Sequence, residues 1–338
     1  MAEEPKRDVR LGSARVSVST GLMTIGAATV LLFVISAVFQ PASVSPTSFS
    51  GMLPIAAVLA IAGLGQMLVV QQGGIDLSVA GGISLALVIV THIPDGDDSR
   101  LLPAIVLALF FAIAAGFLNG ILIGALGLNA IIATLGTNAL LYGINIGISG
   151  GRPRITTRLL GSIAGDSTAG IPNSVFFALA ALLVVSVLVK KTVAGRRFEG
   201  VGANPRAAGA LGLRVRSHRS LSYVWAQLLY CLGGILIAGI TSQPIAYAGD
   251  TFLLPSVAVV VLGGTSLLGG RGYPLATVVA AVFLQQLTQL VDVMGVSPAI
   301  SPLVQAAALA VGVSLYTVDW GGIWRRVNPR RQPVAAPS

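Results

Sequence analysis

The chain has 338 residues, of which 54% are hydrophobic and only 10% are charged. A soluble domain carries about a quarter charged residues, so part of the solvent of this chain must be lipid. Its net charge of +9 would suggest a nucleic-acid partner in a soluble protein, but the placement of the charges favours a membrane protein instead. The single cysteine, Cys231, excludes an intramolecular disulfide, and no residue spacing suggests a metal or a cofactor.

Ten apolar runs follow one another along the chain, and a helix needs about 20 apolar residues to cross a bilayer. Glycine and serine interrupt the fifth, eighth and tenth runs, and the eighth is short for a straight span, so it is expected to be broken or re-entrant. We therefore predict an all-α polytopic membrane protein with about 10 transmembrane helices. The runs are 21–39, 51–71, 75–93, 101–125, 128–149, 171–189, 220–242, 253–269, 273–293 and 300–318.

The basic residues gather on one side of the predicted membrane. With the N-terminus inside, 17 of the 21 Lys and Arg residues fall in cytoplasmic segments, eight of them in the loop 190–219. The positive-inside rule therefore predicts that both termini are cytoplasmic. The expected organisation is a cytoplasmic tail 1–15, a transmembrane domain 16–324 with its cytoplasmic loop 190–219, and a cytoplasmic tail 325–338.

The membrane runs lack the residues that catalysis or ion coupling would need. The sequence has no P-loop and no His-Glu-x-x-His motif, and its acids near the spans, Asp76, Asp292 and Asp319, fall at predicted span ends. An ion-coupled carrier usually keeps acidic residues near the middle of the membrane. The chain is therefore predicted to be neither a membrane enzyme nor an ion-coupled carrier, and energy for transport must come from elsewhere.

A first polar stretch interrupts the apolar sequence between Gly65 and Val90. Gly73 and Gly74 permit a break in a helix, while Asp76 and Ser78 are good capping residues for a restart. Two interpretations remain open: a tight turn with a capped helix, or a discontinuous helix that exposes polar groups to a transport pathway.

A second stretch, from Phe117 to Pro153, places small polar residues inside predicted spans. Such groups either hydrogen-bond neighbouring helices or line a pathway suited to an uncharged, polyhydroxylated solute. Glycines spaced four residues apart before and within this stretch predict close packing against another helix. The polar candidates are Asn119, Thr134, Thr137 and Asn138, and the spaced glycines are Gly116, Gly120 and Gly124.

A third stretch, Leu254 to Val279, contains the pairs Gly263-Gly264 and Gly269-Gly270 around Thr-Ser. A glycine-rich phosphate cradle would normally carry a lysine, which is absent here. The pattern therefore favours a kink and a tight turn at the inner surface over a phosphate site.

A fourth stretch, the loop 190–219, is basic and rich in glycine and alanine. Asn204 as the N-cap and Pro205 at the first helical position predict a short helix with small side chains. Such a surface lets another protein approach closely; the alternative is a solvated basic loop held near anionic lipid.

These stretches, in this order, resemble the permease subunit of ribose-type ABC importers over about residues 50–320. The matching segments are GGIDLSV at 73–79, ATLGT at 133–137, GGRP at 150–153, GANPRAAGALGL at 202–213 and VVLGGTSLLGGRG at 260–272. The resemblance implies a second permease copy or a sibling permease, a separate ATPase subunit and an extracytoplasmic solute-binding protein. It also implies that a coupling helix docks on the ATPase through Gly202, Asn204, Pro205, Ala207, Ala208, Gly209 and Gly212.

The expected function is that of a permease in the bacterial cytoplasmic membrane, without catalytic residues, cofactor or nucleic-acid partner. Its solute is expected to be small and neutral, most simply a monosaccharide or a sugar alcohol. Nucleosides and a furanose signalling molecule remain open within the same family, and a secondary carrier or channel without an ATPase remains open outside it.

Overall fold

The computed structural model describes residues 20–295 without interruption, together with residues 8–11, 14–17 and several positions between 300 and 310. Within this part, seven helical segments are long and apolar enough to cross a membrane, which agrees with the predicted all-α polytopic fold. The predicted run 300–318 lies largely outside the described residues. The long helices are α1 (Thr20–Phe39), α2 (Pro46–Gln71), α4 (Leu101–Asn119) with its π-helical continuation η3 (Gly120–Ala125), α5 (Ala130–Ser149), α7 (Asn173–Lys191), α10 (Val215–Ile240) and α12 (Pro274–Val293).

Two further apolar helices are too short to span a bilayer alone. These are α3 (Val79–His92) and α11 (Leu253–Leu262), the latter preceded by the 3-10 turn η4 (Ala248–Phe252). At about 1.5 Å per residue, neither matches a hydrocarbon core of about 30 Å. Irregular backbone adjoins each of them, which a membrane protein tolerates where other protein segments cover the free polar groups. Almost all of α3 is buried.

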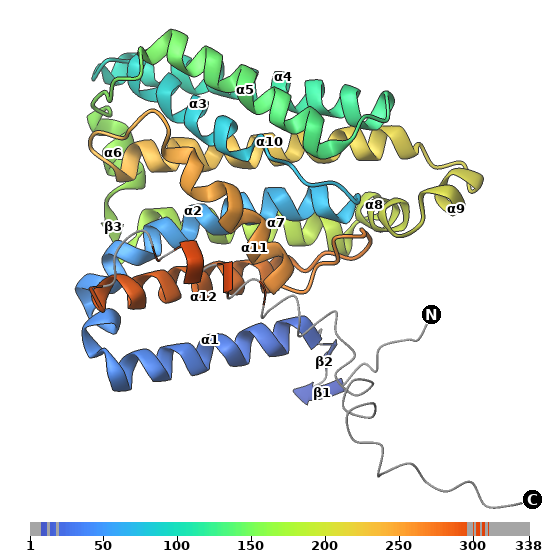
Figure 1. The fold of residues 1–338 in the computed structure, drawn as a ribbon, viewed down its shortest axis with the longest axis horizontal. Helices are drawn as coiled ribbons and strands as arrows, with labels where there is room; N and C mark the ends of the chain where they lie inside the picture. The colour runs from blue at the N-terminus through green and yellow to red at the C-terminus, as the bar shows by residue number, and fades with distance from the viewer. Residues whose placement is uncertain are drawn as a thin grey trace, which may run out of the picture.

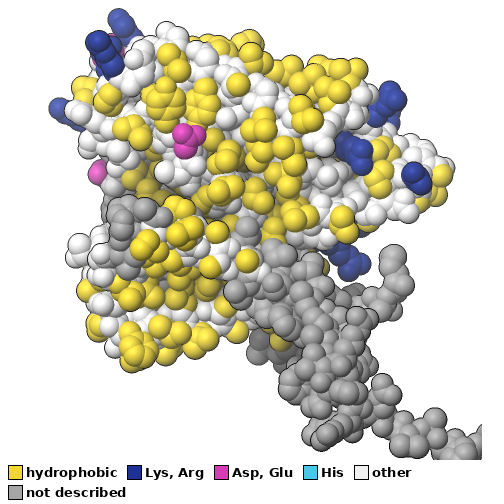
Figure 2. Space-filling model, in the orientation of Figure 1, with side chains coloured by type: hydrophobic (Ala, Val, Ile, Leu, Met, Phe, Trp, Pro, Cys, Tyr) yellow, Lys and Arg dark blue, Asp and Glu magenta, His cyan; other side chains and the backbone are white. Residues whose placement is uncertain are grey.

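The long helices run side by side, and α2, α3 and α10 form the centre of the bundle (Figure 1). Helix α10 packs against α2, α3 and α4, whereas α1 lies at the outside against α12. Figure 2 shows a broad band of hydrophobic side chains between two ends at which the Lys and Arg side chains gather. This distribution is what a bundle with a lipid-facing belt requires.

Short elements lie at the two ends of the bundle. At one end, α8 (Val193–Ala203) and α9 (Pro205–Ala210) follow α7 and project beyond the long helices (Figure 1). We refer to this as the α8–α9 end. The remaining short elements are β1 (Asp8–Leu11) paired with β2 (Ala14–Ser17), η1 (Pro41–Val44), η2 (Asp98–Arg100), α6 (Arg158–Ala164), and β3 (Ser167–Thr168) paired with β4 (Ile171–Pro172).

The loops at the opposite end are tied to one another. Arg154 forms an ion pair with Asp95 at 2.7 Å, and the N–H of Thr156 donates to the carbonyl of Ser242 at 3.2 Å. The amide of Asn145 donates to the carbonyl of Ala246 at 2.7 Å, which fixes the end of α5 to the segment before η4. The loops between the helices thus lie at one end of the bundle or the other, as expected when successive helices cross a membrane in alternating directions.

The spaced glycines of α4 and η3 lie against α10, so the predicted close helix packing is confirmed. A Cβ atom at Gly116 would lie 2.5 Å from Cα of Val224, and one at Gly120 would lie 2.9 Å from the carbonyl oxygen of Ser220. The Ser220 hydroxyl donates to the Gly120 carbonyl at 2.7 Å. A side chain that enters the backbone ladder in this way is a known cause of local helix distortion, here the π-helical segment η3.

Gly116→Ala is therefore expected to destabilise the protein by about 1–3 kcal/mol, because the added methyl group overpacks the α4–α10 contact. The matched control is Gly26→Ala in α1, where a Cβ atom would meet nothing within 4 Å. Thermal denaturation in detergent, followed by size-exclusion chromatography, measures both variants. Equal melting temperatures would contradict the packing argument.

Candidate functional site

The break between α2 and α3 lies inside the bundle and is held by a buried hydrogen-bond network centred on Ser78. The Ser78 hydroxyl donates to the Asp76 carboxylate and accepts from the Asn119 amide at 2.9 Å and the Gln227 amide at 2.8 Å. The Asp76 carboxylate also accepts from the backbone N–H of Ser78 at 2.9 Å. All four side chains are fully buried. Ser78 is the N-cap residue of α3, but its side chain makes no capping bond to the first turn; Asp76, just before it, instead binds the backbone N–H of Ser78 within the protein interior.

Helix α5 contributes the remaining polar residues predicted for this region. The Thr137 hydroxyl donates to the Asn119 amide oxygen at 2.6 Å, and Thr134 accepts from the backbone N–H of Leu77 at 3.0 Å. Asn138 accepts from the N–H of Gly81 at 2.8 Å. The structure thus brings together all six candidate pathway residues, which the sequence could place only on separate segments.

Two glutamines that sequence reasoning missed complete this region. Gln227 on α10 bonds to Ser78, and Gln66 on α2 binds the break from the other side. With its amide turned to suit its neighbours, Gln66 donates to the backbone oxygen of Asp76 and accepts from its N–H, each at 3.1 Å. The signal available in the sequence was an amide inside a largely apolar run: Gln227 is the one amide of the run 220–242, whereas the run 51–71 holds Gln66 and Gln71.

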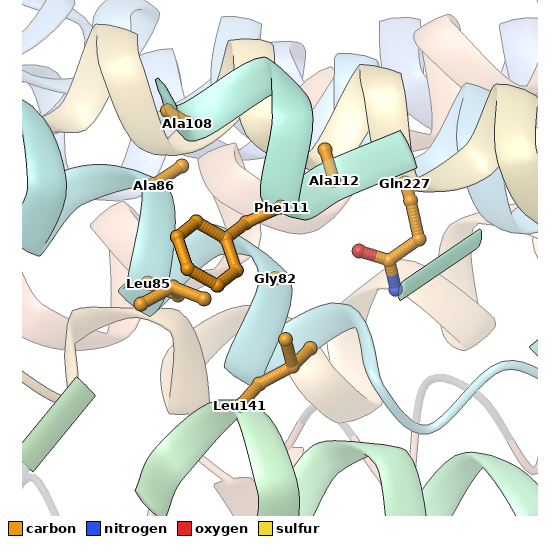
Figure 3. A pocket seen from close by; sticks show the side chains of 8 residues that line it. All are labelled: Gly82, Leu85, Ala86, Ala108, Phe111, Ala112, Leu141 and Gln227. Atoms are coloured by element: carbon orange, nitrogen blue, oxygen red, sulfur yellow. The ribbon is translucent and has the colours of Figure 1, made fainter. Parts of the chain in front are cut away.

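The space beside this network is nearly filled. A cavity of about 10 Å³ lies among α3, α4, α5 and α10, where Phe111 lies beside Leu85 and the Gln227 side chain lies near Gly82 (Figure 3). A cavity of this size holds about one water molecule at most. The network residues therefore bind the helices to one another in this conformation, and a solute could pass here only if α3, α5 and α10 moved apart.

Glycine conformation shapes the break itself. Gly73 has φ of +76°, in the left-handed region, and ends α2. A Cβ atom at Gly74 would lie 2.4 Å from the Tyr223 hydroxyl, so α10 packs directly on the broken backbone.

The second set of predicted breaks lies in the turn between α11 and α12. Gly264, Gly269 and Gly270 all have positive φ, and a Cβ atom at Gly263 would lie 2.9 Å from the backbone nitrogen of Thr277. The stretch forms a tight turn at the α8–α9 end.

Helix α9 begins as the sequence predicts. Asn204 is the N-cap and its side chain accepts from the N–H of Ala207 at 3.1 Å, while Pro205 occupies the first helical position. Gly212, with φ of +79°, follows the helix, and the N–H of Leu213 returns to the carbonyl of Ala208 at 3.0 Å.

The residues expected to dock on a partner divide into exposed and buried groups. Asn204, Ala207, Gly209 and Gly212 are exposed, and Pro205 is half-buried. Ala208 and Gly202 are buried, so they pack this segment and present no surface to a partner. Leu211, which sequence reasoning did not single out, has 82% of its surface exposed at the tip of the segment.

Close backbone contacts join α8 to the end of α2 and to the turn between α11 and α12. The carbonyl of Gln71 accepts from the N–H of Gly270 at 2.9 Å, and a Cβ atom at Gly202 would lie 1.9 Å from the same carbonyl. The Gln72 amide donates to the carbonyl of Phe198 at 2.9 Å. Helix α8 therefore lies in direct contact with the residues immediately before the break.

Fold and site together define a polytopic helical membrane protein with a broken helix at its centre and a small projecting helix at one end. The family described as the branched-chain amino acid transport system / permease component matches residues 48–312. A probable ABC transporter permease protein of Sinorhizobium fredii is 31% identical over 310 residues, covering 90% of this chain and 92% of that protein.

Two relatives have names that state a solute. The ribose import permease of Bacillus subtilis is 30% identical, with 84% of this chain and 89% of that protein covered. The galactose/methyl galactoside import permease of Escherichia coli is 29% identical, with 86% and 92% covered. No solved structure matches the chain.

The chain belongs to this family of ABC importer permease components. It is a multi-pass protein of the bacterial inner membrane and a transport subunit, not itself an enzyme. Permease components of this kind work with an ATPase and a binding protein.

Proposed function

We propose that this permease carries a neutral monosaccharide or sugar alcohol into the cell, driven by a separate ATPase. The chief support is the ribose and galactose solutes in the names of relatives that cover most of the chain. The interior agrees chemically, because the groups around the break are amides, hydroxyls and a single carboxylate. Oδ2 of Asp76 and Oε1 of Gln227 have no hydrogen-bond partner among the described residues, so both could accept from solute hydroxyls when the helices separate.

In this proposal the α8–α9 end is cytoplasmic and α9 is the coupling helix. Support comes from its exposed small residues, from Leu211, and from the basic side chains of the preceding helix, Arg196 and Arg197, which are exposed. ATPase closure would push α9, and α8 would pass the displacement to Gln71 and then to the break. Two permease subunits, identical or sibling, would surround the pathway.

Uptake by the reconstituted importer tests the solute class. We expect proteoliposomes containing the permease, its cognate ATPase and its solute receptor to accumulate labelled D-ribose, D-galactose or myo-inositol only when ATP is supplied. Labelled leucine tests the solute in the family description, and a labelled nucleoside tests the remaining neutral alternative. Preferential uptake of leucine or of an anionic solute would overturn the sugar proposal, and uptake without the ATPase would indicate a secondary carrier or channel.

A further inference from the structure

The segment between α10 and α11 carries a carboxylate into the depth of the bundle. It packs along α3, where the N–H of Gly249 donates to the Ser84 hydroxyl at 3.0 Å and Gly249 leaves no room for a side chain against the Ala80 carbonyl. Helix α11, which follows, has 10 residues and at about 1.5 Å per residue covers about half of a hydrocarbon core of about 30 Å. Asp250 lies in η4, directly before α11, and therefore well inside the hydrophobic belt.

Asp250 is exposed at this depth and lies against two tyrosines. The Tyr142 hydroxyl, from α5, donates to the Asp250 carboxylate, and the ring centroids of Tyr142 and Tyr247 are 5.6 Å apart. Tyr142 follows Ala130, the first residue of α5, by 12 positions, or about 18 Å, which agrees with the depth of Asp250. No ion pair among the described residues includes Asp250. We refer to Tyr142, Tyr247 and Asp250 as the Asp250 cluster.

A surface that meets lipid is composed differently in this chain. Helix α1, at the outside of the bundle, exposes only apolar side chains along its middle and second half, among them Val30, Leu31, Val34 and Val38. A charged side chain against lipid tails is costly, and ionisable residues at membrane depth usually face a bundle interior or a water-filled space. The exposed carboxylate therefore indicates that the face formed by α5 and η4 borders water. In the proposed assembly, this is the face toward the pathway that two subunits surround.

The chemistry of the Asp250 cluster suits a neutral, polyhydroxylated solute. A carboxylate has about four acceptor positions, and Tyr142 uses one of them, so solute hydroxyls can donate to the others. Tyr247 is 38% exposed and offers both an apolar ring face and a hydroxyl. Small-molecule sites commonly combine such aromatic surface with a few polar groups. An anionic solute would be repelled by Asp250, and the carboxylate of a free amino acid would find no cation within the cluster.

We propose that the Asp250 cluster binds the solute on the surface of each subunit that borders the pathway between two subunits. The assignment rests on the proposed sugar transport and names side chains that touch the solute. Asp250 accepts hydrogen bonds from solute hydroxyls, while the Tyr247 ring packs against the apolar face of the sugar. Tyr142 holds the carboxylate in place through its hydroxyl.

Cysteine labelling tests whether this face meets water and solute. The native chain suits the method, because its single cysteine, Cys231, is buried. Thr251→Cys places a thiol at an exposed position next to Asp250, and Val34→Cys is the matched control on the exposed face of α1. In the permease–ATPase complex in lipid nanodiscs, a charged, membrane-impermeant methanethiosulfonate should modify Thr251→Cys and spare Val34→Cys. D-ribose, D-galactose or myo-inositol should slow the modification of Thr251→Cys.

Substitutions in the Thr251→Cys background test the individual side chains. Asp250→Asn should raise the sugar concentration for half-maximal protection about tenfold, the equivalent of one hydrogen bond to a charged group. Tyr247→Leu should also raise it, and Tyr247→Phe, which keeps the ring, should raise it less. The matched control, Asp166→Asn, neutralises an exposed acid directly before β3 and should leave protection as it is in Thr251→Cys alone. Melting temperatures within the range of this control establish that each variant is folded.

The outcomes separate this inference from the proposed function. If the importer accumulates one of these sugars with ATP but Thr251→Cys is not modified, or is modified without protection, the site is wrong and the function stands. Protection by leucine that Asp250→Asn weakens would overturn the sugar assignment in both proposals. If uptake depends on Na⁺ or on a pH gradient and Asp250→Asn removes that dependence, the carboxylate binds a cation and the solute site is wrong.

Discussion

Gly209→Trp in α9 is expected to reduce ATP-driven uptake at least about tenfold while the protein folds and inserts normally. The indole would lie between α9 and the ATPase, and overpacking a close contact costs about 1–3 kcal/mol. A loss of about 1.4 kcal/mol weakens the binding equilibrium tenfold. The permease itself tolerates the change, because a Cβ atom at Gly209 would meet only the Val215 side chain, at 3.8 Å. The loss would therefore arise at the contact with the partner.

The matched control is Gly200→Trp on α8, an exposed position where a Cβ atom would meet nothing within 4 Å. Both variants are compared by size-exclusion profile, by ATP hydrolysis of the assembled complex and by uptake into proteoliposomes. We expect Gly200→Trp to transport normally, and Gly209→Trp to lose uptake and the solute-stimulated part of ATP hydrolysis. Native uptake by Gly209→Trp would remove α9 from the coupling pathway.

Local features of the fold were predictable because their causes lie within a few residues. Run lengths predicted the long helices, and Asn204-Pro205 predicted the start of α9, since a cap depends only on its own turn. The glycine spacing at Gly116 and Gly120 predicted a close helix contact. It could not name α10 as the partner, because a small residue only permits an approach and its partner depends on the three-dimensional packing of other helices.

The site was predictable as a set of residues and not as an arrangement. Ser78 and Gln227 are 149 residues apart, and nothing in either local sequence indicates that they meet. Gln227 was missed because one amide in an apolar run does not interrupt a predicted span. The π-helical segment η3 was likewise not predictable, because it lies where Ser220 from another helix bonds to Gly120.

Ser78→Ala is the substitution expected to disturb the broken helix most. The Ser78 hydroxyl is the acceptor for two buried amides, on Asn119 and Gln227, and the donor to Asp76. Its removal leaves all three without that partner. Interhelical hydrogen bonds in membranes contribute about 0.6 kcal/mol each on average and up to about 1.7 kcal/mol, so we expect a total loss of about 2 kcal/mol. The bonds to Asn119 and Gln227 join the start of α3 to α4 and α10.

Stability and uptake together distinguish a structural clamp from a pathway group at Ser78. Ser50→Ala is the matched control, because the exposed Ser50 hydroxyl donates only within α2, to the Thr47 carbonyl. We expect Ser78→Ala to melt at a lower temperature than Ser50→Ala. Per folded molecule, we expect it to take up solute at least about tenfold more slowly, which corresponds to a loss of about 1.4 kcal/mol in the interaction with the solute. A lower melting temperature with native uptake per folded molecule would leave the network a purely structural role. An unchanged melting temperature would contradict the hydrogen-bond network itself.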